Sequence, residues 1–322
     1  MEQRTMLKNS FISSFKLPKA LVFCLCLIIV LQVGAYFIFT ENNPDMKALD
    51  KLLHSNSKNV DYIFIGDSRI RSNINEETLN KIKNLEYVNL GMGGATAVAQ
   101  YFILKRLVNN NPGMKIRHCI LGVDKQHLTD IYSSRPRENY LTNVLTFREF
   151  REIEKYLPEN QIKAYYLSKI FPSYSTPDHF LVYNVHPDRV FKYPGYKARM
   201  EMYYDIKSEH LAFKKLSKLN MEYTEKIVEF CISNDIHIQL LMNPLPKSIY
   251  EEHQTVNPNG FNRLNDFINH LYKKYQVELI HLPRFLPDNN FHDPSYRLHP
   301  SHLNKEGSIY YTELLIDKII QN

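Results

Sequence analysis

Few cysteines, few glycines and little net charge limit what this 322-residue chain can be. With two of the four cysteines inside one apolar run, we expect Cys119 and Cys231 to be buried free thiols rather than a disulfide or metal site. Ten glycines, without internal repeats or low-complexity runs, argue against a fibrous protein. A charged fraction of 23% beside 44% hydrophobic residues argues against disorder and suits one sizeable core.

One long apolar run does stand out, at residues 20–40. It reads ALVFCLCLIIVLQVGAYFIFT, carries no charge and is interrupted only by Gln32. As a helix rising about 1.5 Å per residue, it would cross a hydrocarbon layer of about 30 Å. A core helix would normally show a polar face, so the run predicts a transmembrane anchor.

The charges that flank this run predict its orientation. Four basic residues and one acidic residue precede it, and Glu41 and Asp45 follow. Because basic residues stay on the cytoplasmic side, residues 1–19 should be cytoplasmic and residues 41–322 extracytoplasmic, in a single-pass protein of the cell membrane. A cleaved signal peptide is less favoured, since 33–35 is a poor cleavage site and lies inside the run.

The exported part carries little net charge. Removing the N-terminal charges from the 40 basic and 34 acidic residues of the chain leaves an excess of about three positive charges. This excess is too small to predict binding to nucleic acid.

Beyond a polar stalk at 41–58, with a short helix at 46–54, short apolar runs alternate with amphipathic stretches. The apolar runs are expected strands, at 60–66, 86–91, 116–123, 236–243 and 277–282. The amphipathic stretches are expected helices, at 95–108, 211–234, 261–275 and 305–320. This alternation predicts one α/β domain over 59–322, a three-layer α/β/α sandwich around a mostly parallel, flavodoxin-like sheet.

The alternation breaks at about 129–210, which is rich in tyrosine and basic residues and has expected helices at 146–156 and 161–170. This segment is too long for a plain loop. We expect a helical insertion over the strand ends that shapes a substrate cleft. A packed extra layer that never meets substrate is an equally good interpretation.

Ser68 is the first candidate for chemistry. It follows Asp67 in I-F-I-G-D-S-R, directly after a predicted strand, and Gly66 allows a tight turn beneath it. Ligands of open parallel sheets bind at the carboxyl ends of strands, so a serine there can face a cleft, and we expect Asp67 beside it to contact substrate. An Asp-Ser pair after a strand can equally be a helix N-cap.

Two further blocks lie at predicted strand ends or before a helix. The stretch Y-V-N-L-G-M-G-G-A-T at 87–96 is a glycine-rich turn whose N–H groups could stabilise an oxyanion, although a plain tight turn or phosphate loop is also compatible. Its glycine spacing does not fit a dinucleotide fingerprint. Near the C-terminus, His302 precedes the last predicted helix, where it could accept the proton of a serine hydroxyl.

Together these blocks resemble those of the SGNH (GDSL) hydrolases. G-D-S, N-x-G-x-x-G-A-T and H-x-x-H-L-N-x-x-G occur in the family's order across nearly all of residues 60–320, apart from the insertion. The resemblance implies that Ser68 is the nucleophile and that its own N–H donates to the oxyanion. It also implies that Gly94 is a second oxyanion donor and His302 the general base.

Two positions depart from the family pattern. The third block usually supplies an oxyanion asparagine, but this chain has Asp124 in L-G-V-D, and loss of such a donor can cost roughly 10²–10³ in rate. The closing block usually has an aspartate three residues before the histidine, where this chain has His299. Asp293 in the same loop, or a backbone carbonyl, could orient His302 instead.

Other interpretations of these residues remain. His292, Asp293, His299 and His302 could form a zinc cluster, but their spacing matches no strong metal motif, so we expect neither metal nor cofactor. Asn243, after the fourth predicted strand, could contact substrate at the same rim, or simply end its strand.

Two functions follow. The first is acyl transfer through Ser68, as an esterase or an O-acyltransferase. The resemblance extends to membrane-tethered SGNH proteins that modify envelope polymers, such as those of teichoic acid D-alanylation and alginate O-acetylation, which often work beside a multi-span acyl-donor protein. A glycan or acylated glycopolymer is then the expected substrate.

The second is a catalytically degenerate module that binds or assembles surface polysaccharide. The missing asparagine and aspartate support it. So do tyrosines of the insertion that could stack on sugars or merely pack. These are Tyr140, Tyr165, Tyr166, Tyr183 and Tyr193.

Overall fold

The computed structural model describes most of the α/β domain and the apolar N-terminal helix. The described residues are 19–42, 59–92, 95–123, 128, 144–170, 217–247, 250–251, 258–287, 291 and 302–319, with backbone alone at 20, 35–42, 170 and 258–261. Of the expected stalk at 41–58, residues 41 and 42 end the N-terminal helix, and the rest, with the short helix expected at 46–54, lies outside the described residues.

A five-stranded parallel sheet forms the centre of the domain. Its strands are β1 (Asn59–Ile65), β2 (Tyr87–Asn89), β3 (Lys115–Gly122), β4 (His237–Leu241) and β5 (Glu278–Leu279). They pair in the order β2-β1-β3-β4-β5, and every pair is parallel. This is a doubly wound order, with a switch point between the ends of β1 and β3. The predicted α/β fold with a parallel sheet is confirmed.

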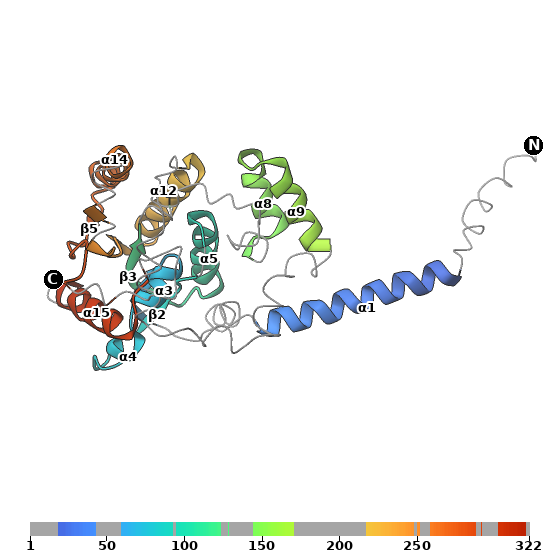
Figure 1. Cartoon of the computed structure of the whole chain (residues 1–322), viewed down its shortest axis with the longest axis horizontal. Helices are drawn as coiled ribbons and strands as arrows, with labels where there is room; N and C mark the ends of the chain where they lie inside the picture. The colour runs from blue at the N-terminus through green and yellow to red at the C-terminus, as the bar shows by residue number, and fades with distance from the viewer. Residues whose placement is uncertain are drawn as a thin grey trace, which may run out of the picture.

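Helices cover both faces of this sheet (Figure 1). One face carries α5 (Ala97–Asn110), α12 (Lys218–Ser233) and α14 (Pro258–Tyr275), and the other carries α3 (Ser68–Asn73), α4 (Glu76–Leu79) and α15 (Lys305–Ile319).

Alternation along β1 explains the layering. Ile63 and Ile65 belong to the core beneath α5 and α12, whereas Phe64 belongs to the core beneath α15. Side chains of successive strand residues point to opposite faces, so this apolar run supplies both cores.

The described part of the insertion packs against α5. It consists of α8 (Phe147–Ile153), the 3₁₀ turn η1 (Glu154–Tyr156) and α9 (Glu159–Ile170), close to the expected helices. Arg106 of α5 forms an ion pair with Glu149 and donates to the carbonyl of Val144. Phe150 stacks on Tyr165, whose hydroxyl donates to a backbone carbonyl. These contacts among α5, α8 and α9 fit the interpretation of the insertion as a packed extra layer.

The predicted sugar-stacking tyrosines of this part therefore have packing roles. Tyr165 is 1% exposed within the main core, and Tyr166 packs against that core while its hydroxyl donates to Glu154. Tyr140, Tyr183 and Tyr193, and the rest of 129–210, lie outside the described residues.

The two cysteines of the domain are free and fully buried, as predicted. Cys119 of β3 and Cys231 of α12 both have 0% exposure. Hydrogen bonding to Cys231 and burial raise the pKa of the Cys119 thiol well above its ordinary value, so this thiol stays protonated and unreactive.

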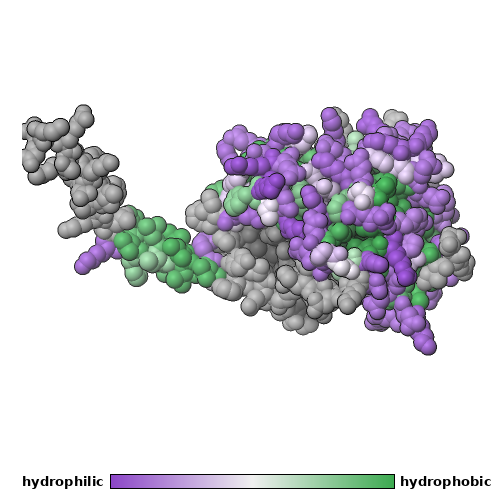
Figure 2. Space-filling view, turned by 180° about the vertical axis from the view of Figure 1, so that it is seen from behind, coloured by the Kyte–Doolittle hydropathy of each residue, from purple (hydrophilic) through white to green (hydrophobic). Residues whose placement is uncertain are grey.

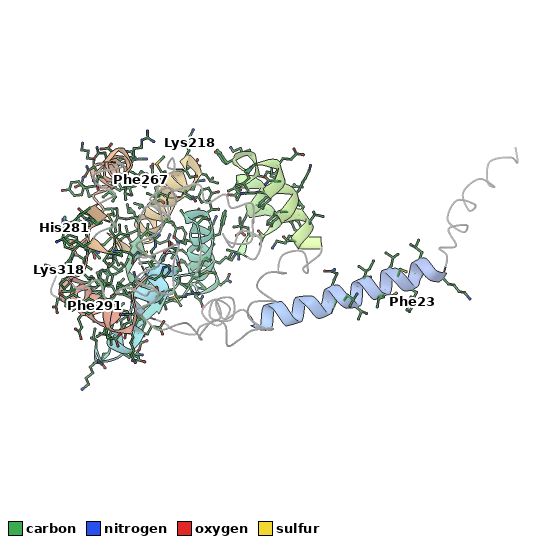
Figure 3. The ribbon with its side chains drawn as sticks, viewed as in Figure 1. Phe23, Lys218, Phe267, His281, Phe291 and Lys318 are labelled. Carbon is green, nitrogen blue, oxygen red and sulfur yellow. The ribbon has the colours of Figure 1, made fainter. Side chains whose placement is uncertain are left out.

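The apolar N-terminal run forms one continuous helix, α1 (Lys19–Asn42), apart from the α/β domain (Figures 1 and 2). Its described large hydrophobic side chains, including Phe23, point outward around the helix and are 44–68% exposed (Figure 3). Among the residues described with both backbone and side chain, no helix is long and apolar enough to cross a membrane.

Candidate active site

Ser68 lies at the carboxyl end of β1, where the chain turns into α3. Gly66 makes the turn possible, because a Cβ atom there would lie 2.1 Å from Cγ1 of Ile70. Asp67 is the N-cap of α3 and accepts a hydrogen bond from the backbone N–H of Arg69. The N-cap interpretation of the D-S pair is thus confirmed for Asp67, and Ser68 begins the helix with a half-buried side chain.

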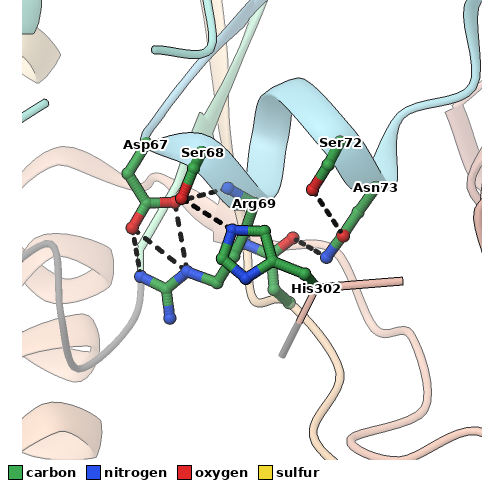
Figure 4. A network of polar contacts seen from close by, with 7 residues as sticks. Asp67, Ser68, Arg69, Ser72, Asn73 and His302 are labelled. Carbon is green, nitrogen blue, oxygen red and sulfur yellow. Dashed lines mark hydrogen bonds and ion pairs between the residues drawn. The ribbon is translucent and has the colours of Figure 1, made fainter. Parts of the chain in front are cut away.

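His302 meets Ser68 from the opposite end of the chain. Its Nε2 lies 2.7 Å from Ser68 Oγ, although the two residues are 234 positions apart (Figure 4). The imidazole is 1% exposed and precedes α15, which packs against α3. When Nδ1 carries the ring proton, Nε2 accepts the hydrogen bond from the serine hydroxyl. This is the arrangement of a nucleophile and its general base.

Asp67 is engaged with Arg69 rather than open to a ligand. Its two carboxylate oxygens accept from Arg69 Nε at 3.1 Å each, and it also pairs with Nη2. Burial would raise the pKa of Asp67, but the charge and hydrogen bonds of Arg69, together with His302, hold it below its ordinary value. The carboxylate is therefore ionised, and its predicted contact with substrate stays a prediction.

Asn73, at the end of α3, joins three parts of the site. Its Nδ2 donates to Oδ1 of Asn243 at 3.1 Å, and its Oδ1 accepts from the backbone N–H of Leu303 at 2.9 Å. The side chain of Asn243 is 6% exposed, and its Oδ1 is engaged by Asn73. Its predicted contact with substrate is untested.

The glycine-rich turn after β2 lies beside the Ser68 turn. The backbone N–H of Met92 donates to the carbonyl of Gly66 at 3.1 Å. A Cβ on Gly91 would lie 2.3 Å from the backbone nitrogen of Arg71, so only glycine allows this close approach. The predicted oxyanion donor Gly94 lies outside the described residues, so its role stays a prediction.

Four other predicted residues also lie outside the described residues: His292, Asp293, His299 and Asp124. The backbone N–H of Val123, next to Asp124, donates to the carbonyl of Leu241, which places the end of β3 at the same edge. Within the described part of the chain, no three histidine, cysteine, aspartate or glutamate side chains gather to hold a metal. Because Asp293 lies outside the described residues, its proposed role in orienting His302 stays a prediction.

Reasoning from sequence did not find Arg69 or Asn73 as site residues. Arg69 is 3% exposed and Asn73 is fully buried, although neither stands in an apolar run. The signal for Arg69 was its place two residues after a capping aspartate. Asn73 had no local signal, because its partners are 170 and 230 positions away.

Comparisons with known proteins leave the family open. No family model and no curated protein matches the chain. The chain is similar to a solved structure described as a candidate platelet activating factor from Streptococcus pneumonia, at 13% identity and a TM-score of 0.40, over 93% of this chain and 97% of that one. A candidate lipolytic protein of the G-D-S-L family from Desulfitobacterium hafniense DCB-2 gives 12% identity and 0.38, over 80% and 98%. The function must be inferred from this chain's own residues.

Proposed function

We propose that this chain is a membrane-anchored serine enzyme that transfers or hydrolyses acyl groups on extracytoplasmic glycans. The observation that carries the proposal is the 2.7 Å contact between Ser68 Oγ and His302 Nε2 at the carboxyl edge of a parallel sheet. A half-buried serine against a buried imidazole, at the rim where ligands of such sheets bind, suits nucleophilic catalysis.

The chemistry follows from this contact. Ser68 Oγ attacks the carbonyl carbon of an ester while His302 Nε2 takes the hydroxyl proton. The tetrahedral oxyanion is held by the N–H of Ser68 and, by resemblance to the SGNH hydrolases, by that of Gly94. His302 then protonates the departing alkoxide, which leaves an acyl-Ser68. Water or a sugar hydroxyl, deprotonated by His302, releases the acyl group; water makes the protein an esterase and a sugar an O-acyltransferase.

A serine-directed phosphonate tests this proposal directly. Incubation of the full chain in detergent with a fluorescent alkyl phosphonate should label Ser68, and His302→Gln should slow labelling by at least about 10²-fold because the base is lost. Peptide mass spectrometry identifies the labelled residue. Absence of labelling, together with no turnover of a short-chain aryl ester, would refute the enzyme and leave the polysaccharide-binding module as the better explanation.

The anchor and the topology are part of the same proposal. They are supported by the uncharged run at 20–40, by the exposed apolar side chains of α1, and by the basic residues that precede it. A domain tethered in this way stays close to membrane-proximal glycopolymers, which supports a glycan acceptor and an acyl donor delivered by a multi-span membrane protein.

Membrane association gives a separate prediction. The full chain should sediment with membranes, resist extraction by carbonate and require detergent for release. Added protease should digest residues 41–322 in spheroplasts without lysis. A variant with Leu25, Ile28, Ile29 and Leu31 changed to Lys should lose membrane insertion, since each central lysine costs about 2.5–3.5 kcal/mol. Protection of the domain from protease would contradict the topology without touching the Ser68 chemistry.

A further inference from the structure

Asn73 occupies an unusual position relative to the candidate dyad. It lies on the same short helix as Ser68, it is fully buried, and its side chain faces the segment that carries His302 (Figure 4). Its Oδ1 accepts from the Leu303 N–H at 2.9 Å and from the Ser72 hydroxyl at 3.1 Å. Its Nδ2 donates to Asn243 at 3.1 Å.

The bond to Leu303 fixes the chain immediately after His302. Leu303 is buried in the core between α3 and α15, and the next backbone N–H, that of Asn304, donates to the carbonyl of Phe291. Asn304 then caps α15 through the Gly307 N–H. The imidazole is thus carried by a backbone that is hydrogen-bonded to the nucleophile's own helix.

The bond to Asn243 fixes Asn73 in turn. Asn243 lies two residues after β4, and Tyr311 of α15 donates to the backbone carbonyl of the neighbouring Met242, so the backbone that carries Asn243 is anchored beside α15. An amide serves here because it donates and accepts at once. Alanine would remove these bonds to the Leu303 N–H and the Asn243 oxygen in a buried place, where the loss of a hydrogen bond is unfavourable.

We propose that Asn73, held by Asn243, is a positioning residue that sets the distance between His302 and Ser68 through the backbone of Leu303. The inference rests on the proposed serine chemistry, which it deepens. In this proposal, the buried amide of Asn73 helps to orient the imidazole, a role that a carboxylate beside the ring usually has. Through its bond to the Leu303 N–H, Asn73 acts by holding the His302 segment in register with Ser68.

Asn73→Ala and the matched control Asn75→Ala test the proposal. Asn75 also ties the α3–α4 segment to α15, but its side chain bonds to Ser308 and to Thr78, where it caps α4, rather than to Leu303. We expect Asn73→Ala to lower kcat by about 10- to 100-fold with KM changed less than about threefold, because a displacement of about 1 Å at the reacting atoms costs rate rather than binding. Asn75→Ala should lose thermal stability but keep kcat within about threefold.

Asn73→Asp separates positioning from packing. The aspartate keeps an oxygen that accepts from Leu303, and the Asn243 amide can turn to donate to it. Its kcat at high pH should recover to within about fivefold of the parent. A carboxylate near His302 favours the imidazolium, so the acidic limb of the pH profile should move to higher pH. Equal kcat losses in Asn73→Ala and Asn75→Ala, or no recovery in Asn73→Asp, would overturn the inference.

A readout without catalysis distinguishes this failure from failure of the proposed function. Histidines labelled with ¹³C at Cε1 give an imidazole signal for His302, assigned by its loss in His302→Gln. This signal should shift or broaden in Asn73→Ala and stay unchanged in Asn75→Ala, even if the protein hydrolyses no ester. An unchanged His302 signal in Asn73→Ala would show that Asn73 does not position the ring.

Discussion

Ser68→Ala is expected to lower turnover of a short-chain aryl ester by at least about 10³-fold, since removing the nucleophile of a serine–histidine unit leaves only binding and oxyanion stabilisation. The hydroxyl is half-buried and lies 2.7 Å from His302 Nε2, so the substitution removes one hydrogen bond and little packing. The free energy of unfolding should therefore change by about 1 kcal/mol or less. Steady-state kinetics and thermal unfolding by circular dichroism measure the two effects.

Ser233→Ala is the matched control for this prediction. Ser233 ends α12, is exposed, and its hydroxyl donates to the carbonyl of Phe230. Activity should stay within about 20% of the parent because this hydroxyl is far from the edge that carries Ser68, as an exposed surface change normally has little effect. Turnover that survives in Ser68→Ala would eliminate the acyl-serine mechanism, whatever the structure of the rest of the site.

The sheet could be predicted because its strands are short apolar runs that appear in the sequence itself. The expected runs at 60–66, 116–123 and 236–243 correspond to β1, β3 and β4, which are paired on both sides. The two edge strands are shorter than expected. β5 pairs only at Glu278–Leu279, because the chain turns at Ile280–Leu282 and Pro283 has no N–H to continue the ladder.

The meeting of Ser68 and His302 could be predicted for a topological reason. A turn after a parallel strand and a loop before the final helix both lie at the carboxyl edge of the sheet. The order of the motifs along the chain then indicated which serine and which histidine would meet there. The packing of the insertion could not be predicted. Helical spacing in 146–170 shows that α8 and α9 form but does not show that Glu149 would pair with Arg106.

Buried polar residues mark the limit of local patterns. Arg69 and Asn73 stand in a polar stretch that reads as an exposed helix, but α15 and the His302 segment cover them from the far end of the chain. The folded chain offsets the desolvation cost of burying these side chains by providing hydrogen-bonding partners: Asp67 for Arg69, and Leu303 with Asn243 for Asn73. A sequence lists such residues but does not show which surfaces will close over them.

The Asp67–Arg69 pair leads to the second large effect, on stability. Arg69→Met keeps most of the buried aliphatic volume but leaves the Asp67 carboxylate, which is 6% exposed, without its cation. Removing one partner of a buried ion pair typically costs about 3–5 kcal/mol. Urea unfolding of the full chain in detergent at pH 7 should show a loss of this size. Arg71→Met, an exposed change on the same helix, should cost about 0.5 kcal/mol or less.

The pH dependence of this loss identifies Asp67 as its cause. In the parent, the pKa of Asp67 is lowered, so its stabilisation is full above the unfolded pKa of about 3.9 and is lost as pH falls through the folded value. Without Arg69, burial raises the pKa of Asp67, and the folded state then binds the proton more tightly than the unfolded state. Stability of the variant should fall as pH rises from about 4, so its deficit is largest at neutral pH and shrinks toward pH 4. Asp67→Asn in the Arg69→Met background should recover most of the stability lost at neutral pH, because it removes the unpaired charge. A deficit that is equal at pH 4 and pH 7, or no recovery in the double variant, would show that the loss comes from packing instead.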